Sequence, residues 1–499
     1  MPKVLGTRGE DFIHQAGDGL NPPPGYGDII GTTELKDLVR AGGGDDVVHA
    51  GGGEDTVRGA DGNDILYGDL GNDFVYAESG DDIAHGGSGD DLLYGGDGQD
   101  ILHGAGDDDA VFAGDGQDIL YGGGGNDWML GENGRDELFG GDGNDRLYSS
   151  SYFFPAGDTV DGEVLSGGEG DDSLSGSGGT DILDGGNGTD EVWYYTLRGA
   201  GVRVNLSAGT ASGGDGGGRD TLISVENVIV LWDGFIPGEG PAGGGNDTLI
   251  GNEGANWLGG GGGSDRLFGK GGNDTLDLTS TGDWLHGGDG QDWLSCYFPD
   301  NEGDYFTTVV NLAAGTARAA ALSQDRLASI ENVSANLGDD TVIGSGAANQ
   351  IDGLSSDDRL TGRYGNDTLI GGGGADALSG GRGADELWGD DPRWGGISAD
   401  RFLYREVTAS GVGTGSRDII RDFDPSDGDV IVLKRMDADV GAAGDQAFTF
   451  IGAAAFGGAA GELRYAGGVV AGDVDGDGAA DFEIELSGAP TLTRGDFAL

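Results

Sequence analysis

The sequence predicts an all-β fold: blocks of parallel β-roll, a solenoid of stacked coils, joined by β connectors and followed by a C-terminal β-sandwich-like domain. Two observations predict the rolls. Gly makes up 111 of the 499 residues, about three times its usual share. A nine-residue phrase also repeats without slippage from residue 41 to residue 148. Since the Gly period is nine instead of three and Pro numbers only 11, a collagen helix is excluded.

Each phrase contains the parts of half a coil. In residues 59–67 (GADGNDILY), six turn-forming residues precede three strand-forming ones. Glycine permits positive φ and favours the turn, and the last three residues favour a short strand. Because side chains alternate along a strand, the eighth residue is expected to face inward and the seventh and ninth outward. Two phrases would close a coil of 18 residues, and coils would stack in parallel about 4.8 Å apart.

Two positions of the phrase keep their residue class throughout this block. The eighth is always apolar: Val48, Val57, Leu66, Val75, Ala84, Leu93, Leu102, Val111, Leu120, Met129, Leu138 and Leu147. The sixth is always aspartate: Asp46, Asp55, Asp64, Asp73, Asp82, Asp91, Asp100, Asp109, Asp118, Asp127, Asp136 and Asp145.

The aspartates indicate a cation. Residues one coil apart, such as Asp64 and Asp82, would stack as like charges, and one apolar side chain per phrase cannot offset the ordering entropy of the rest. Carboxylates and turn carbonyls form an all-oxygen cage, which suits Ca²⁺. The sequence therefore predicts Ca²⁺ in the turns, about 20 ions if each lies between neighbouring coils. Turns that are merely solvated are the alternative.

The phrase matches the pattern G-G-x-G-x-D-x-U-x, and in it the chain resembles the RTX family of hemolysin-type calcium-binding repeats. The resemblance extends to three more blocks and implies calcium ligands at their sixth positions: Asp172, Asp181, Asp190, Asp247, Asp265, Asp274, Asp283, Asp292, Asp340, Asp358, Asp367, Asp376 and Asp385. Asn256 and Asn349 replace Asp in this frame. Because Asn lacks the charge, we expect those turns to bind weakly or to act as spacers.

The frame and its interruptions divide the chain. We expect an N-terminal cap of degenerate repeats at 1–40, rolls at 41–148, 149–193, 242–295 and 335–394, β connectors at 194–241 and 296–334, and a C-terminal domain at 395–499. Both connectors carry V-N-L, A-G-T-A and D-x-L-x-S-[VI]-E-N-V. Their alternating apolar residues predict small hairpins that act as spacers, with a ligand-binding insert as the alternative.

Residues 395–499 resemble the C-terminal domain of serralysin-type metalloproteases. Strand-like segments such as DIIRDFDPSDGDVIVL and GDVDGDGAADFEIEL alternate with turns, and the last four residues, DFAL, are an acid followed by apolar residues. In that family this domain follows a calcium roll and carries an uncleaved type I secretion signal. The resemblance implies a secreted or cell-surface protein with the type I secretion apparatus as a partner.

One acidic loop lies within this last region. Asp473, Asp475 and Asp477 match the start of a D-x-D-x-D-G calcium loop, with Asp481 at the ninth place. The twelfth place is Ile484 instead of Glu, so the loop is not an EF-hand. A partial calcium site and a hydrated acidic turn both remain open.

The amino-acid composition limits the kinds of partner that the chain can bind. Asp and Glu number 89 against 26 Lys and Arg, a net charge of −63. This excess requires a cationic partner and argues against nucleic acid, which needs a basic surface. The single cysteine, Cys296, cannot form an internal disulfide and is expected to be a small buried residue. No apolar run predicts a secretory signal peptide or a transmembrane segment.

No catalytic motif accompanies the repeats. None of the five histidines is followed by Glu, which excludes the H-E-x-x-H motif of zinc proteases, and no G-x-S-x-G elbow occurs. We therefore expect a calcium-binding structural, surface or adhesive protein and not an enzyme. The alternative is an RTX-associated extracellular enzyme or toxin, protease- or polysaccharide-related, without a recognisable catalytic motif.

Outward-facing residues 18 apart would form two aromatic stripes in the first block. One contains Tyr67, His85, His103 and Tyr121, and the other contains Tyr76, Tyr94 and Phe112, followed by Trp128 and Leu130 in the next coil. An apolar surface of this size tends to be covered. Three interpretations stay open: packing against another block, a platform for extracellular polysaccharide or a cell-surface partner, and a transition-metal pair at His85 and His103.

Overall fold

A computed structural model of the chain describes residues 3–5, 11–15, 27–32, 35–150, 162–176, 178–196, 200–213, 218–232, 245–278, 282–296, 307–319, 324–393 and 397–499. In these ranges the chain forms β-strands and short 3₁₀ turns, with no α-helix, so no helix there is long and apolar enough to cross a bilayer. The chain divides into two compact units, Met1–Asn252 and Glu253–Leu499. The predicted all-β parallel roll is confirmed.

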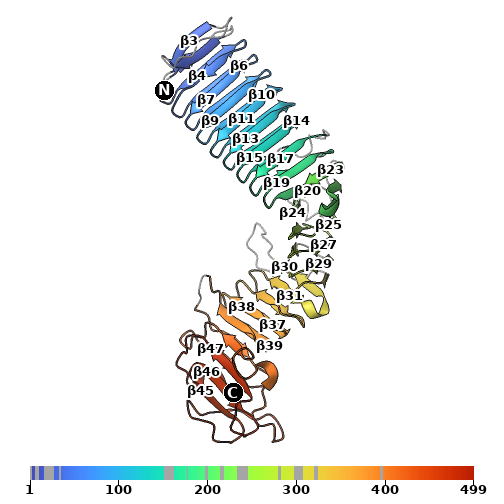
Figure 1. The fold of residues 1–499 in the computed structure, drawn as a ribbon, viewed down its shortest axis with the longest axis vertical. Helices are drawn as coiled ribbons and strands as arrows, with labels where there is room; N and C mark the ends of the chain where they lie inside the picture. The colour runs from blue at the N-terminus through green and yellow to red at the C-terminus, as the bar shows by residue number, and fades with distance from the viewer. Residues whose placement is uncertain are drawn as a thin grey trace, which may run out of the picture. The chain divides into compact units, whose positions relative to one another are not determined.

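The first unit winds between two parallel sheets (Figure 1). Ile65 pairs with Ile83, and Phe74 pairs with Leu92, so each coil takes 18 residues as predicted. One sheet contains β1 (Lys3–Leu5), β4 (Leu38–Gly43), β6 (Thr56–Asp61), β8 (Phe74–Ser79), β10 (Leu92–Gly98), β12 (Ala110–Gly116), β14 (Trp128–Gly134), β16 (Arg146–Tyr148), β18 (Ser173–Ser175), β20 (Glu191–Thr196) and β24 (Asn227–Trp232). The other contains β2 (Asp11–Gln15), β3 (Gly27–Thr32), β5 (Val47–His49), β7 (Ile65–Leu70), β9 (Ile83–Ser88), β11 (Ile101–Gly106), β13 (Ile119–Gly124), β15 (Glu137–Asp142), β17 (Val164–Glu169), β19 (Ile182–Asn187) and β23 (Arg219–Ile223).

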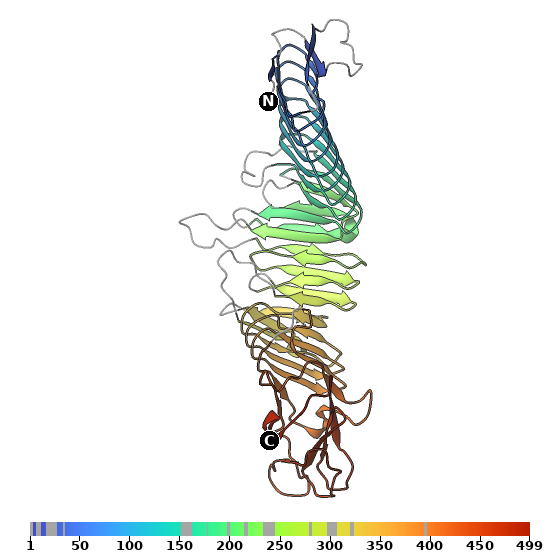
Figure 2. The same cartoon turned by 90° about the vertical axis from the view of Figure 1, so that its left-hand side faces the viewer.

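Most strands of the first unit are longer than the three residues that the phrase predicts, so the expectation was wrong for these strands, whereas β5, β16 and β18 have three residues as expected. β7 runs through the last three residues of one phrase and the first three of the next, which leaves a turn of three residues before the next strand (Figure 2). Glycine makes this possible. At Gly62, φ is +134°, a conformation that side chains other than glycine's rarely adopt.

The interior of the roll is narrow. The eighth residue of every phrase from Val48 to Leu147 is fully buried, as predicted. Along β7 the buried residues are Leu66 and Gly68, while Ile65 and Tyr67 on the opposite face are half-buried. One apolar side chain per phrase, together with a glycine or alanine, fills the space between the sheets.

The first connector is a three-stranded antiparallel meander of β21 (Val202–Asn205), β22 (Thr210–Gly213) and β23, with a 3₁₀ turn η1 (Leu206–Ala208). Its outer strands continue the roll, because β23 pairs in parallel with β19 and β21 pairs in parallel with β25 (Thr248–Ile250).

The second unit repeats this plan. One sheet contains β26 (Trp257–Gly259), β28 (Thr275–Asp277), β30 (Trp293–Ser295), β34 (Asn332–Ser334), β36 (Gln350–Asp352), β38 (Thr368–Gly372) and β40 (Glu386–Asp390). The other contains β27 (Arg266–Gly271), β29 (Trp284–Asp289), β33 (Asp325–Ala328), β35 (Thr341–Ile343), β37 (Arg359–Tyr364) and β39 (Ala377–Arg382). The second connector is the meander β31 (Thr308–Asn311), η2 (Leu312–Ala314), β32 (Thr316–Ala319) and β33.

The C-terminal region continues both sheets of the second unit. β41 (Arg401–Leu403), β43 (Val430–Val432) and β48 (Phe497–Ala498) follow β39, and β42 (Asp418–Ile420) and β47 (Phe482–Leu486) follow β40. β45 (Glu462–Ala466) and β46 (Val469–Asp473) add antiparallel strands to β47, and β44 (Thr449–Phe450) pairs with β45. The 3₁₀ turns η3 (Val407–Ala409) and η4 (Arg494–Asp496) complete the region.

Candidate metal sites

The repeat aspartates form two ladders along each roll. Each lies between a glycine-rich turn and a strand, and its backbone N–H donates to Oδ1 of the aspartate one coil further on. Asp64 donates to Asp82 over 2.7 Å, and Asp82 donates to Asp100 over 2.8 Å. All of the predicted repeat aspartates take part in such bonds, including Asp247 and Asp340, whose Oδ1 atoms accept from the connector residues Val202 and Thr308.

The second carboxylate oxygen is the unusual feature. In most ladder aspartates Oδ2 is buried and has no hydrogen-bond donor: Asp55, Asp64, Asp73, Asp82, Asp91, Asp100, Asp109, Asp118, Asp127, Asp145, Asp172, Asp181, Asp190, Asp274, Asp292, Asp358, Asp367, Asp376 and Asp385. Gly59 lies directly against Oδ2 of Asp64, where a Cβ atom would collide with it and would lie 2.7 Å from the carbonyl oxygen of Ala77. Oxygen atoms therefore gather at the turn without a proton donor.

The electrostatics are unfavourable without a counter-charge. Burial raises the pKa of Asp64 to about 7; the hydrogen bond from Asp46 opposes this shift, and the charge of Asp82 adds to it. Burial likewise raises the pKa of Asp109 to about 8, with Asp91 and Asp127 adding like charge. A buried carboxylate without a partner is costly. A hard cation with oxygen ligands, such as Ca²⁺, would remove this cost.

The ladders also include acids that lie outside the repeats. Oδ1 of Asp220 accepts from the N–H of Asp181, Oδ1 of Asp400 accepts from Asp376, and Oδ1 of Asp418 accepts from Asp385. Further members are Glu226, Asp325, Glu331 and Asp429. Sequence reasoning missed them because the glycine frame is lost there. The signal that survives is a triplet of an acid, any residue and a buried apolar residue, such as DTL, DRL and DRF.

Asn349 shows what an amide does at the sixth position. Its Nδ2 donates to the carbonyl of Glu331 at 2.5 Å and to Oγ of Ser345 at 3.1 Å, and its Oδ1 accepts from the N–H of Ser345. The amide provides both donor and acceptor, so the turn is satisfied by the chain itself. This geometry favours the spacer role expected of Asn349.

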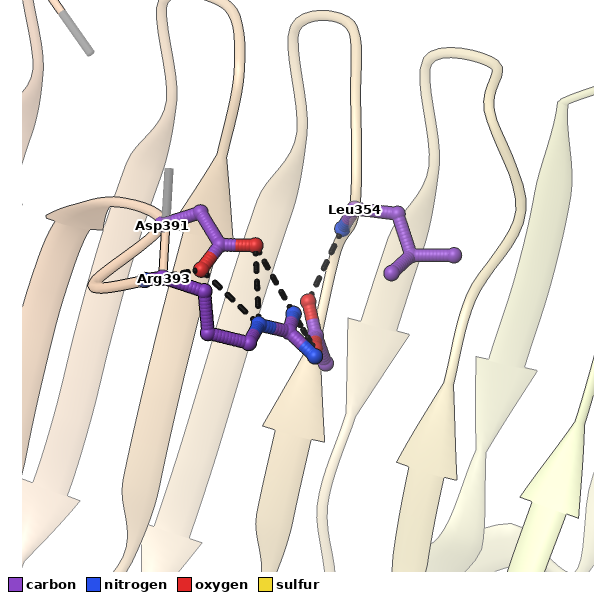
Figure 3. Close-up of polar contacts among 4 residues, drawn as sticks. Leu354, Asp391 and Arg393 are labelled. Atoms are coloured by element: carbon purple, nitrogen blue, oxygen red, sulfur yellow. Dashed lines mark hydrogen bonds and ion pairs between the residues drawn. The ribbon is translucent and has the colours of Figure 1, made fainter. Parts of the chain in front are cut away.

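At one point on the second roll, an arginine side chain neutralises carboxylates in place of a metal ion. Arg393 donates through Nε and Nη2 to the carboxylate of Asp391, at 2.9 and 2.8 Å, and through Nη2 to Oδ2 of Asp352 at 2.9 Å (Figure 3). The N–H of Leu354 donates to the other oxygen of Asp352. Two carboxylates are thus neutralised by the chain.

The acidic loop of the C-terminal region brings Asp473, Asp475 and Asp481 together, with oxygen atoms within 4.8 Å of one another. Asp477 is not part of this group. The loop also supplies hydrogen-bond donors to its own carboxylate, because the two oxygens of Asp473 accept from the N–H groups of Gly476 and Gly478. Both interpretations, a partial calcium site and an acidic turn, fit this arrangement.

The predicted aromatic stripes are stacks of rings, except that Trp128 meets Phe112 edge-on, with 75° between their planes. His49, Tyr67, His85, His103, Tyr121 and Phe139 follow one another with ring centroids 4.3 to 5.2 Å apart and nearly parallel planes. Each ring face is covered by its neighbour, so the stack presents ring edges. The nitrogen lone pairs of an imidazole lie in the ring plane; with 5° between the planes of His85 and His103, they do not converge on a shared metal.

The comparison with protein families agrees with this geometry. The sequence profile of the RTX calcium-binding nonapeptide repeat matches residues 40–75, 76–111, 112–147, 159–192, 241–276, 279–295, 329–360 and 352–387, just over half of the chain. No curated protein matches at a significant level. One matching solved structure is the solution structure of the AlgE6R3 subunit from the Azotobacter vinelandii mannuronan C5-epimerase, with 24% identity over 31% of this chain and 80% of that one, at a TM-score of 0.23. With two ladders of buried aspartates in the matched segments, the chain belongs to the family of RTX calcium-binding nonapeptide repeat proteins.

Proposed function

We propose that this chain is exported without calcium and folds when it meets extracellular Ca²⁺, to serve as a structural, surface or adhesive protein. The observation that carries the proposal is the set of buried Oδ2 atoms without donors. A folded roll that lacks cations would hold many uncompensated carboxylates, so the metal-free state is expected to be unfolded.

Calcium acts in this proposal as a folding ligand. A ligand that binds only the folded state stabilises it by mass action. Extracellular modules bind Ca²⁺ with dissociation constants of about 10⁻⁴ to 10⁻³ M. A calcium-poor cytosol would leave the chain unfolded and ready for export, and the outside medium would fold it. About 20 ions are expected from the repeats alone.

Export is assigned to the C-terminal region. Residues 395–499 resemble the serralysin-type domain, which implies an uncleaved type I secretion signal near the C-terminus. The partners are then calcium ions, the type I secretion apparatus and, outside the cell, a polysaccharide or cell surface. Because the stacks present ring edges, such a surface would contact the stripes from the side and not by stacking on ring faces. We propose no catalytic role for the chain.

Circular dichroism and the hydrodynamic radius, measured across a calcium titration of the full chain, test this proposal. In EGTA we expect expanded rolls and a strand signal reduced to that of the C-terminal region, with a cooperative change to a compact, strand-rich state in the millimolar range. A glycan array then tests the folded chain for a carbohydrate partner. A chain that stays compact and strand-rich in excess EGTA overturns calcium-driven folding.

A further inference from the structure

The two connectors end the aspartate ladders in different ways. In each, a buried residue follows the last repeat aspartate by four positions, at a place where most phrases have glycine. This residue is Tyr194 after Asp190 and Cys296 after Asp292. Their places are equivalent, because Tyr194 lies in β20, which pairs in parallel with β24, and Cys296 directly follows β30, which pairs in parallel with β34.

At the first connector a hydroxyl group satisfies the ladder acid. Tyr194 donates from its hydroxyl to Oδ2 of Asp220 at 3.0 Å. Oδ1 of Asp220 accepts from the N–H of Asp181 at 3.2 Å. Both oxygens of this carboxylate therefore have a donor, and the phenol occupies the place beside Oδ2.

At the second connector the equivalent acid lacks this donor. Asp325 opens β33, which pairs with β29 as β23 pairs with β19. Its Oδ1 accepts from the N–H groups of Gly282 and Asp283 at 2.6 and 3.0 Å. The residue is fully buried, and its Oδ2 has no hydrogen-bond partner. Cys296 stands where the first connector has Tyr194, and its short side chain does not hydrogen-bond to Oδ2.

The charges around Cys296 are all negative. Burial raises the pKa of its thiol well above the usual range, and the carboxylates of Asp340, Asp277 and Asp325 raise it further. Asp340 already accepts from two backbone N–H groups, so it has no donor to offer Asp325. A buried carboxylate in such surroundings requires a cation.

We propose that Asp325 binds a Ca²⁺ ion at the junction of the roll and the second connector, and that the hydroxyl of Tyr194 replaces such an ion at the first. The site lies outside the segments matched by the repeat profile. The proposal rests on the proposed function, since it takes calcium as the cation, and it adds a ligand that the nonapeptide does not contain.

Native mass spectrometry of the calcium-loaded full chain counts its bound ions and tests the site. Asp325→Asn removes the charge and is expected to lower the count by one. Cys296→Tyr introduces the phenol of the first connector and should also lower the count by one. Two controls should keep the full count: Asp220→Asn, whose site already has a hydroxyl, and Cys296→Ala, because the thiol is not a ligand. Circular dichroism at saturating calcium checks that each variant folds.

The outcomes separate the two proposals. A wild-type chain without bound calcium overturns the proposed function. A wild-type chain with many ions, and a folded Asp325→Asn variant with the same number, overturns the connector site alone. If Asp325→Asn does not fold, Cys296→Tyr decides, and a full count in that variant overturns the site as well.

Discussion

The first roll block, residues 41–148, and the C-terminal region, residues 397–499, differ in how far the chain itself neutralises its acids. Both contain many buried acids. In the roll, aspartates such as Asp100 and Asp118 keep an Oδ2 without a donor. In the C-terminal region, Asp400 and Asp418 continue the ladders and also keep such an Oδ2, whereas the half-buried Glu483 and Glu485 pair with Arg417 at 2.9 and 2.6 Å.

The two regions also differ in how many apolar side chains they bury. The roll buries one apolar side chain per phrase, whereas the C-terminal region packs aromatic rings against one another. Phe402 lies 5.9 Å from Phe423, and Phe448 lies 5.7 Å from Phe482, between ring centroids. Apolar burial is the main favourable contribution to folding. The C-terminal region therefore contains stabilising contacts of its own, whereas under the proposed function the roll depends on bound calcium.

Removal of calcium should produce the largest difference between the two regions. In EGTA we expect backbone amides of residues 41–148 to lose about 100-fold or more of their protection from hydrogen exchange, since a saturating ligand contributes on that scale. Amides of β45, β46 and β47 should change less than about 10-fold, because apolar packing and Arg417 hold them. Hydrogen exchange with mass spectrometry measures both regions in one sample. Equal loss in the two regions would show that calcium stabilises them alike.

Acid should partly replace calcium in the roll. Burial raises the pKa of Asp100 to about 7 and that of Asp109 to about 8, above the unfolded value of about 4. The metal-free folded roll thus binds more protons than the unfolded chain, so its stability rises as the pH falls from about 8 to about 4. Calcium binding weakens over the same range, since protons compete for the carboxylates.

Circular dichroism of the chain freed of metal checks this dependence. The strand signal should be larger at pH 5 than at pH 8 without calcium, and the calcium concentration at the folding midpoint should be lower at pH 5, because acid already stabilises the folded roll before calcium binds. A metal-free strand signal that falls on acidification contradicts the assigned role of the buried carboxylates.

The repeat aspartates were predictable because their period of nine residues is half that of the coil. A residue that recurs every nine positions between a turn and a strand must stack on itself, and Asp64 and Asp82 do so. The inward position of Leu66 follows from strand alternation in the same way. Local patterns of this kind predict the roll and most of its ladders.

What the sequence does not predict arises from distant pairs. The bond from Tyr194 to Asp220 joins residues 26 positions apart, and no periodicity relates them. Asp325 and Asp400 enter the ladders without glycine around them, so the frame does not identify them. The length of the strands was also missed, because Gly68 counts locally as a turn former but lies within β7, where a side chain would collide with Asp73.

The smallest expected effect concerns Arg393, which supplies charge from the chain itself within a roll. Arg393→Gln removes the guanidinium from Asp352 and Asp391. Because this guanidinium is 57% exposed, the loss should be about 1 kcal/mol, at the upper end for a surface pair. Hydrogen exchange of β36 and β38 in saturating calcium should rise about 5-fold.

Arg382→Gln is the matched control. Arg382 pairs with the single acid Glu406, both side chains are more than half exposed, and its other contact is with the ring of Tyr364, so exchange should change by less than about 2-fold. Neither substitution should shift the calcium midpoint, since neither arginine contacts a ladder aspartate. A raised midpoint in Arg393→Gln alone would mean that calcium and arginine neutralise the same carboxylates. The contrast between acids neutralised by calcium and acids neutralised by arginine would then not hold within the roll.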